Sequence, residues 1–164
     1  MRLIALAFVL TLAACDEPSE AEQKAARDAA VAEVEANRHP PTEQLELDPI
    51  RYPEIEKHNL HGAGCSFTPT DGGLGTVALV QPDRGYMIRK GELLTFSPDA
   101  GSAEGPFGTR RKYDGLRYAL EIVLHTGSAT SGAYEVIDYR GTLTVRDERG
   151  DTVYNAPGLI QCGS

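Results

Sequence analysis

Two histidines and a cysteine lie close together in the stretch His58-Asn59-Leu60-His61-Gly62-Ala63-Gly64-Cys65. Imidazole and thiolate groups at such spacings can bind zinc, and a structural site needs four ligands. His125 is the other candidate of this type. Cys65 also has a possible disulfide partner in Cys162, so we favour a polar segment with exposed His58 and His61. We expect no bound metal and no cofactor, and zinc binding at the two histidines stays the alternative.

Nucleophilic catalysis needs a serine or cysteine beside a base, and a third group that orients the base. The sequence has no G-x-S-x-G elbow, and its best base is His125, which Thr126-Gly127-Ser128 follows. The paired acids Asp147 and Glu148 belong to a predicted turn. The glycine-rich Asp71–Gly75 lacks the lysine and the following serine or threonine of a phosphate-binding loop. The sequence therefore assigns no catalytic residue.

A compact basic run, Arg110-Arg111-Lys112-Tyr113, follows a predicted flexible loop over residues 101–108. Arginine clusters bind carboxylates and phosphates bidentately. The run is therefore a candidate binding site for an acidic envelope component or an acidic protein. The alternative, which we favour, is that these side chains alternate on an edge strand, where charge discourages aggregation.

The chain begins MRLIALAFVLTLAAC. Arg2 precedes an uncharged run, Leu3–Ala14, which is shorter than the ~20 residues that span a membrane and is typical of a signal peptide. The run ends in Leu12-Ala13-Ala14-Cys15, which resembles the lipobox of bacterial lipoproteins. The resemblance implies removal of residues 1–14 and lipid on Cys15. The alternative is an ordinary signal peptide with a chance cysteine at its cleavage site.

The lipid would make the membrane a partner of this chain, because several acyl chains at ~0.8 kcal/mol per buried methylene give stable anchoring. We therefore expect a location in the bacterial cell envelope, facing the periplasm. Asp16 resembles the inner-membrane retention signal of enterobacterial lipoproteins. That rule does not hold in all bacteria, so both membranes stay open.

Two cysteines remain after Cys15, and they lie near the two ends of the C-terminal part. In an exported protein such a pair indicates a disulfide, here Cys65–Cys162. The alternative is two reduced, buried cysteines. In the chain-entropy model, a bridge that closes so long a loop stabilises the fold by roughly 4–5 kcal/mol.

The charge is concentrated near the N-terminus. Residues 15–57 carry 12 acidic and 5 basic side chains, and residues 58–164 carry 12 and 10. A nucleic-acid-binding protein needs a basic footprint, which neither part has. We therefore exclude nucleic acid as a partner.

Residues 15–57 have the composition of a stalk. Alanine and glutamate, both good helix formers, dominate residues 16–38, and Ser19 with Glu22 fits a capping box. Glu20 and Lys24 have the spacing of a helical ion pair. Four prolines in residues 39–57 favour an extended linker, whose apolar residues we expect to dock partly on the domain. A partner-binding coiled coil is the alternative for the helix, although no Leu/Ile heptad supports it.

From Gly62 onward, apolar residues recur with a period of two, which is typical of antiparallel strands. Residues 116–124 are the clearest case, with Leu116, Tyr118, Leu120, Ile122 and Leu124 on one face. Leu143, Val145 and Val153 are predicted core residues in a hairpin that turns at Asp147–Gly150. Further strands are expected at 63–67, 76–81, 85–90, 92–97, 109–113 and 158–162. About eight short strands predict a mainly β fold, a small antiparallel barrel or sandwich, in one domain over residues 58–164.

These features favour a membrane-tethered, noncatalytic β-domain that binds or supports another envelope component. In anchor, size and strand content, the chain is similar to small β-rich envelope lipoproteins such as the membrane-bound C-type lysozyme inhibitors. Their inhibitory motif cannot be aligned here, so the resemblance implies lysozyme inhibition only as a candidate and assigns no residue. The alternative is a hydrolase or a metal-dependent envelope enzyme whose residues are scattered across strands.

Overall fold

The computed structural model describes residues 19–38, 42–71, 75–125, 127–131 and 136–164, and these residues divide into two compact units at Pro41/Thr42. The first unit contains helix α1 (Glu20–Asn37), as the alanine-rich sequence predicted. Ser19 and Glu22 form the capping box, with the Glu22 N–H donating to Ser19 Oγ at 3.3 Å and the Ser19 N–H to Glu22 Oε2 at 2.8 Å. Lys24 pairs with Asp28, at 2.8 Å, and not with Glu20.

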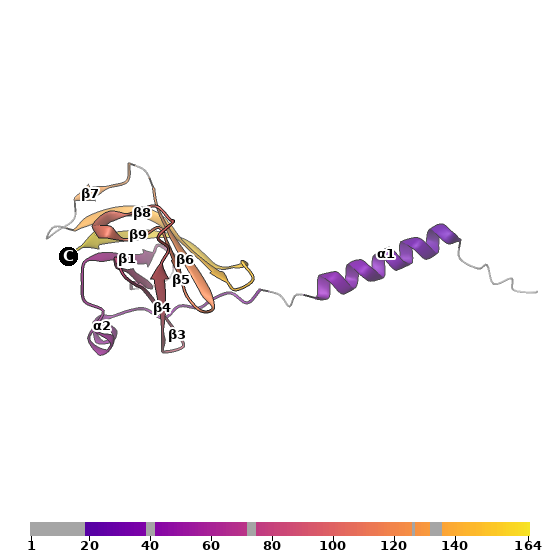
Figure 1. Cartoon of the computed structure of the whole chain (residues 1–164), viewed down its shortest axis with the longest axis horizontal. Helices are drawn as coiled ribbons and strands as arrows, with labels where there is room; N and C mark the ends of the chain where they lie inside the picture. Colours follow the sequence, from indigo (N-terminus) through magenta and orange to yellow (C-terminus); the bar gives the residue numbers. More distant parts are fainter. Residues whose placement is uncertain (1–18, 39–41, 72–74, 126, 132–135) are drawn as a thin grey trace, which may run out of the picture. The chain divides into compact units, whose positions relative to one another are not determined.

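The second unit is a closed antiparallel β-barrel (Figure 1). Among the described residues, eight strands follow one another around the ring, and the last pairs with the first. This arrangement decides between the barrel and the sandwich that the sequence left open. The eight are β1 (Gly64–Pro69), β2 (Ala78–Val80), β3 (Gly85–Arg89), β4 (Glu92–Pro98), β5 (Lys112–Asp114), β6 (Tyr118–Leu124), β8 (Ile137–Asp147) and β9 (Thr152–Gly163). The two-residue strand β7 (Thr130–Ser131) pairs with the start of β8, outside the ring.

The period-two pattern correctly identified the inward-facing residues of the strands. Leu143 and Val145 are fully buried and Val153 is 4% exposed, as predicted. Inward-facing side chains fill the barrel from all sides, including Phe67, Met87, Tyr113, Leu120, Leu143, Ile160 and Cys162. The residues that alternate with them point away from this core, as expected for strands with one face packed on the core.

Several strand limits differ from the prediction. Leu116 was placed on the buried face of its strand, but it lies in the β5–β6 turn and is fully exposed. The strand expected over 109–113 forms only at Lys112–Asp114 and is preceded by the short 3-10 helix η1 (Pro106–Gly108). The strand expected over 158–162 is longer than predicted, because β9 begins at Thr152 and continues through Pro157. A side chain at Gly158 would collide with the Phe67 ring, so this position allows β1 and β9 to approach closely.

The linker residues from Thr42 onward belong to the barrel unit, which therefore begins before the boundary at residue 58 that the composition suggested. The Leu45 N–H donates to Val153 O, the Asp48 N–H to Ile88 O and the Ile50 N–H to Thr76 O, at 2.7 to 2.8 Å. These hydrogen bonds lie toward the end of the barrel that carries the β3–β4, β5–β6 and β8–β9 turns, and we call it the hairpin end. Leu45 is 5% exposed and joins the barrel core there.

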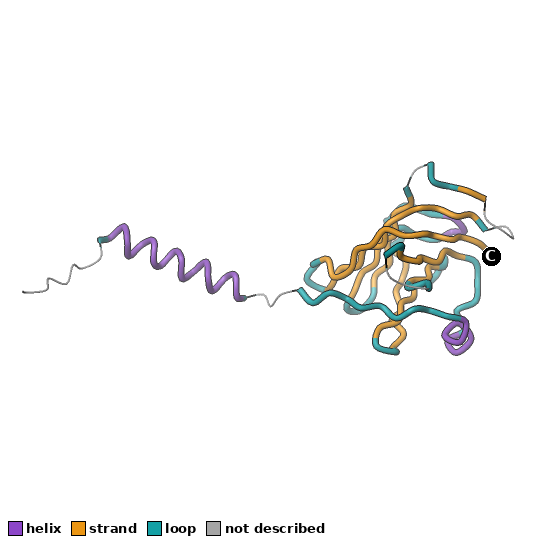
Figure 2. Tube along the Cα trace, turned by 180° about the vertical axis from the view of Figure 1, so that it is seen from behind, coloured by secondary structure: helices purple, strands orange, loops and turns teal. Residues whose placement is uncertain are grey.

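A helix that the proline-rich sequence did not predict, α2 (Tyr52–His58), follows in the linker (Figure 2). Pro53 is tolerated because it occupies the first turn, where backbone N–H groups need no helical partner. Glu54 accepts the N–H of Arg51 at 3.0 Å, and Asn59 ends the helix in the left-handed conformation. Around this helix, Ile50, Ile55 and Leu60 pack on the outer face of three strands. They form one cluster with Leu79 of β2, Ile88 of β3 and Leu93 of β4.

Candidate functional site

A cavity of about 200 Å³ lies opposite the hairpin end, at the end of the barrel where β2–β3, β4–β5 and β6–β8 are connected. We call it the end cavity. Strands β1, β2, β6 and β9 supply its apolar wall, formed by Cys65, Val80, Ile122, Leu124 and Ile160. The β4–β5 connection lines the cavity with Ala103–Pro106 and Thr109–Arg111. We call this whole connection, Ala103–Arg111 with η1 in it, the cover segment.

Backbone hydrogen bonds fold the cover segment back on itself. The Gly105 N–H donates to Thr109 O at 2.8 Å, and the Arg111 N–H donates to Ala103 O at 2.9 Å. The tip turns at Phe107 and Gly108, which both have positive φ, 55° and 74°. Positive φ is uncommon for a bulky residue, and Phe107 remains partly exposed there. The sequence suggested a loop here but gave no sign that it covers a cavity.

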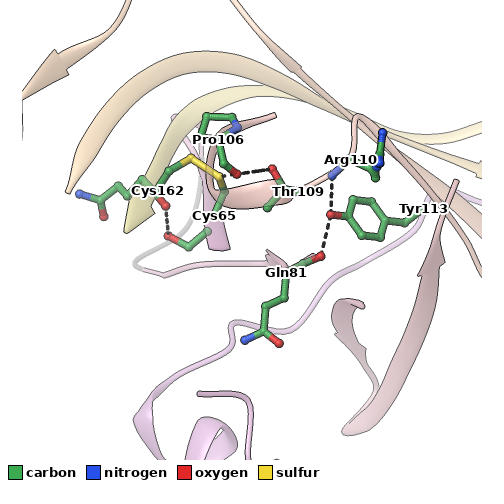
Figure 3. Close-up of a disulfide and its surroundings, with 9 residues drawn as sticks. Cys65, Gln81, Pro106, Thr109, Arg110, Tyr113 and Cys162 are labelled. Atoms are coloured by element: carbon green, nitrogen blue, oxygen red, sulfur yellow. Dashed lines mark hydrogen bonds between the residues drawn. A yellow bond between two sulfur atoms is a disulfide. The ribbon is translucent and has the colours of Figure 1, made fainter. Parts of the chain in front are cut away.

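Cys65, which lines the end cavity, forms a disulfide with Cys162, and this bond confirms the predicted pairing (Figure 3). The two cysteines are directly opposed on β1 and β9, with Cα atoms 4.0 Å apart. The bridge therefore fastens the strand pair that closes the barrel. Thr109, at 3% exposed, lies over it with Oγ1 4.0 Å from Cys65 Sγ and donates to Pro106 O at 2.8 Å.

A buried tyrosine fixes the cover segment to the barrel. The Tyr113 hydroxyl donates to Gln81 O and accepts the N–H of Arg110, both at 2.8 Å (Figure 3). Burial raises the pKa of Tyr113, and this outweighs the lowering by the Arg110 N–H and charge. The phenol is therefore neutral at physiological pH and keeps its donor role.

The basic run does not form the edge strand that we favoured, because β5 pairs on both sides, with β4 and β6. Its members have separate surroundings. Tyr113 is in the core and Lys112 is exposed. Arg110 and Arg111 line the end cavity. The structure thus brings two of the four candidate binding residues to one site.

Two of the three residues of the possible zinc site, His61 and Cys65, have other partners. His61 Nε2 lies 2.8 Å from Glu56 Oε1, and Cys65 is held in the disulfide. His58 is in α2. Within the described part of the chain, no three histidine, cysteine or acidic side chains are grouped as metal ligands.

The catalytic candidates are also apart. His125 Nε2 lies 3.2 Å from Thr142 Oγ1, and Ser128 Oγ donates to the His125 carbonyl, not to the ring. The described residues therefore assemble no Ser-His-acid group at His125. Asp147 accepts hydrogen bonds within the β8–β9 turn. Burial tends to raise its pKa, but the N–H groups of Asp151 and Arg149 and the Arg149 guanidinium together lower it.

Some predicted features lie outside the described residues. These are Cys15 with its whole signal segment, and Gly72, Gly73 and Leu74 of the glycine-rich stretch. Neither α1 nor α2 is long and apolar enough to cross a membrane. No family model, no curated protein and no solved structure matches this chain.

Proposed function

We propose that this chain is a lipid-anchored protein of the bacterial cell envelope whose β-barrel is a noncatalytic binding module, and that the end cavity is its ligand site. The observation that carries the proposal is a cavity with an apolar interior, formed by Val80, Ile122 and Ile160, and an arginine at its rim. Small-molecule sites combine an apolar body with a few fixed polar groups, and β-barrels hold such sites at their mouths.

The anchoring part of the proposal is supported by the lipobox resemblance at Leu12–Cys15 and by the acidic, alanine-rich segment that follows it. A disulfide at Cys65–Cys162 is consistent with export to an oxidising compartment. The enzyme alternative loses its best candidate, since the His125 ring contacts a threonine. Lysozyme inhibition stays a separate prediction, tested by adding the pure protein to lysozyme in micromolar excess.

The test of ligand binding uses a neutral apolar probe, 1-hexanol, and the chain from residue 16 onward, which keeps every described residue. The protein is exported so that the disulfide forms and is purified without detergent, because detergent would compete for the cavity. We expect saturable shifts in the methyl NMR signals of Val80, Ile122 and Ile160. An absence of saturable shifts at these methyls, both with 1-hexanol and with a charged probe of the same chain length, would show that the cavity is not a ligand site.

A pair of variants locates the bound probe. Leu124 lines the end cavity, so Leu124→Phe fills it and should abolish the shifts. Leu94 packs on the same core but does not line the cavity, so Leu94→Phe makes the same change elsewhere and should leave binding intact. If the probe binds equally to both variants, its site is not the end cavity.

A further inference from the structure

The two arginines at the end cavity differ in how completely their charge is compensated. Arg111 makes a close double contact with Glu121, with Nε 2.7 Å from Oε1 and Nη2 also against that oxygen. Arg110 is held more loosely. Its Nη1 donates to Ser102 O at 3.3 Å, and its Nη2 lies 3.9 Å from Glu104 Oε2, on a side chain that is 66% exposed. An exposed pair at that distance contributes little, so Arg110 has donors to offer a ligand.

The backbone of Arg110 is held by hydrogen bonds, even though its guanidinium has donors without close partners among the described residues. Its N–H donates to the buried Tyr113 hydroxyl, which donates in turn to Gln81 O. The backbone of Arg110 also forms an isolated antiparallel β-bridge with Glu104. The next residue, Arg111, accepts the Ile122 N–H at its carbonyl oxygen. The base of the Arg110 side chain is therefore placed at the rim before any ligand arrives, and such preorganisation lowers the cost of binding.

The interior of the cavity sets the size and polarity of what can enter. Val80, Ile122 and Ile160 form an aliphatic wall, closed by Pro106 of the cover segment. An aliphatic cavity of ~150 Å³ holds benzene. The end cavity, at about 200 Å³, therefore has room for an aliphatic chain of roughly six to eight carbons.

Resting on the function proposed above, we propose that the end cavity selects short-chain monocarboxylates, with the chain between β1, β2, β6 and β9 and the carboxylate on the Arg110 guanidinium. A carboxylate matches the planar fork of arginine and forms charge-assisted hydrogen bonds with it. The ligand carboxylate would replace Glu104, which is more exposed and makes only a distant contact.

The test compares hexanoate with 1-hexanol, which has the same chain and no charge, by methyl NMR titration of the detergent-free chain from residue 16. We expect hexanoate to bind at least tenfold more tightly than 1-hexanol, with an advantage that falls as salt is added. Equal affinities would overturn carboxylate selection while leaving the cavity as an apolar site. Failure of both probes to bind would overturn the proposed function as well.

Charge variants identify the recognising group. Arg110→Gln should weaken hexanoate binding far more than 1-hexanol binding and so remove the preference for hexanoate, while Arg110→Lys should restore part of that preference. Lys112→Gln removes an equal charge from an exposed residue outside the cavity and should keep the full preference. If Arg110→Gln retains its 1-hexanol affinity and still prefers hexanoate tenfold, Arg110 is not the carboxylate site. If it loses 1-hexanol binding as well, its role is structural and the proposal is wrong.

Discussion

Removing the Cys65–Cys162 bridge should destabilise the barrel strongly. The two cysteines are 97 residues apart in the sequence. In the chain-entropy model, a loop of about this length loses roughly 4.7 kcal/mol of stabilisation when it is opened. Small domains are stable by only about 5–15 kcal/mol in total, so the predicted loss is a large part of the whole.

The measurement is equilibrium unfolding in urea of the wild-type protein and of the double variant Cys65→Ala/Cys162→Ala, with alanine chosen because Cys162 is fully buried. The variant should unfold at a much lower urea concentration and with a larger m-value, because its unfolded chain is more expanded. Hydrogen exchange should also accelerate most in β1 and β9, which the bridge joins. A loss of under about 1 kcal/mol would refute the entropic reasoning.

Three further predictions concern the linker, the core and the anchor. Leu45→Ala should lower the free energy of unfolding in urea by about 2–5 kcal/mol, as for other buried leucines. Leu116→Ala is the control and should change it by less than about 0.5 kcal/mol, because Leu116 is fully exposed. Equal effects would show that the linker does not belong to the barrel core. Because burial raises the pKa of Tyr113, the folded chain keeps the phenol proton above pH ~10, where the unfolded chain releases it. The urea midpoint should therefore fall as pH rises past ~10, and this loss should shrink in Tyr113→Phe; an unchanged alkaline loss in that variant would assign it to other groups. Cys15→Ser should release the protein from the membrane fraction, and a variant that stays there would contradict lipid anchoring.

The alternation of apolar residues was enough to predict a mainly β fold of short antiparallel strands, but it left the choice between a barrel and a sandwich open. It correctly indicated that Leu120, Ile122, Leu143 and Val145 face inward, because one buried face imposes a period of two. It failed at Leu116, where the same alternation runs one step beyond the strand into the turn. Strand limits depend on which neighbour supplies hydrogen bonds, and a single sequence does not contain that information.

The linker and the cavity depend on tertiary contacts. Prolines in residues 39–57 predicted an extended linker, but α2 forms within it because Pro53 occupies a first turn and Ile55 packs on the barrel. Arg110 was identified as a candidate from its neighbours in the sequence. Its cavity partners Val80, Ile122 and Ile160 were not, because apolar strand residues look alike whether they fill a core or line a space.

The location of a bound ligand tests the central claim most directly. With 1-hexanol bound to the detergent-free chain, nuclear Overhauser effects should connect the probe to methyl groups of Ile122 and Ile160 in the end cavity. Ile88 provides the comparison, because it is equally buried but lies in the cluster outside the barrel. Contacts to Ile122 and Ile160 are the predicted result. Contacts to Ile88 alone, or to none of the three, would contradict the assignment of the end cavity as the binding site.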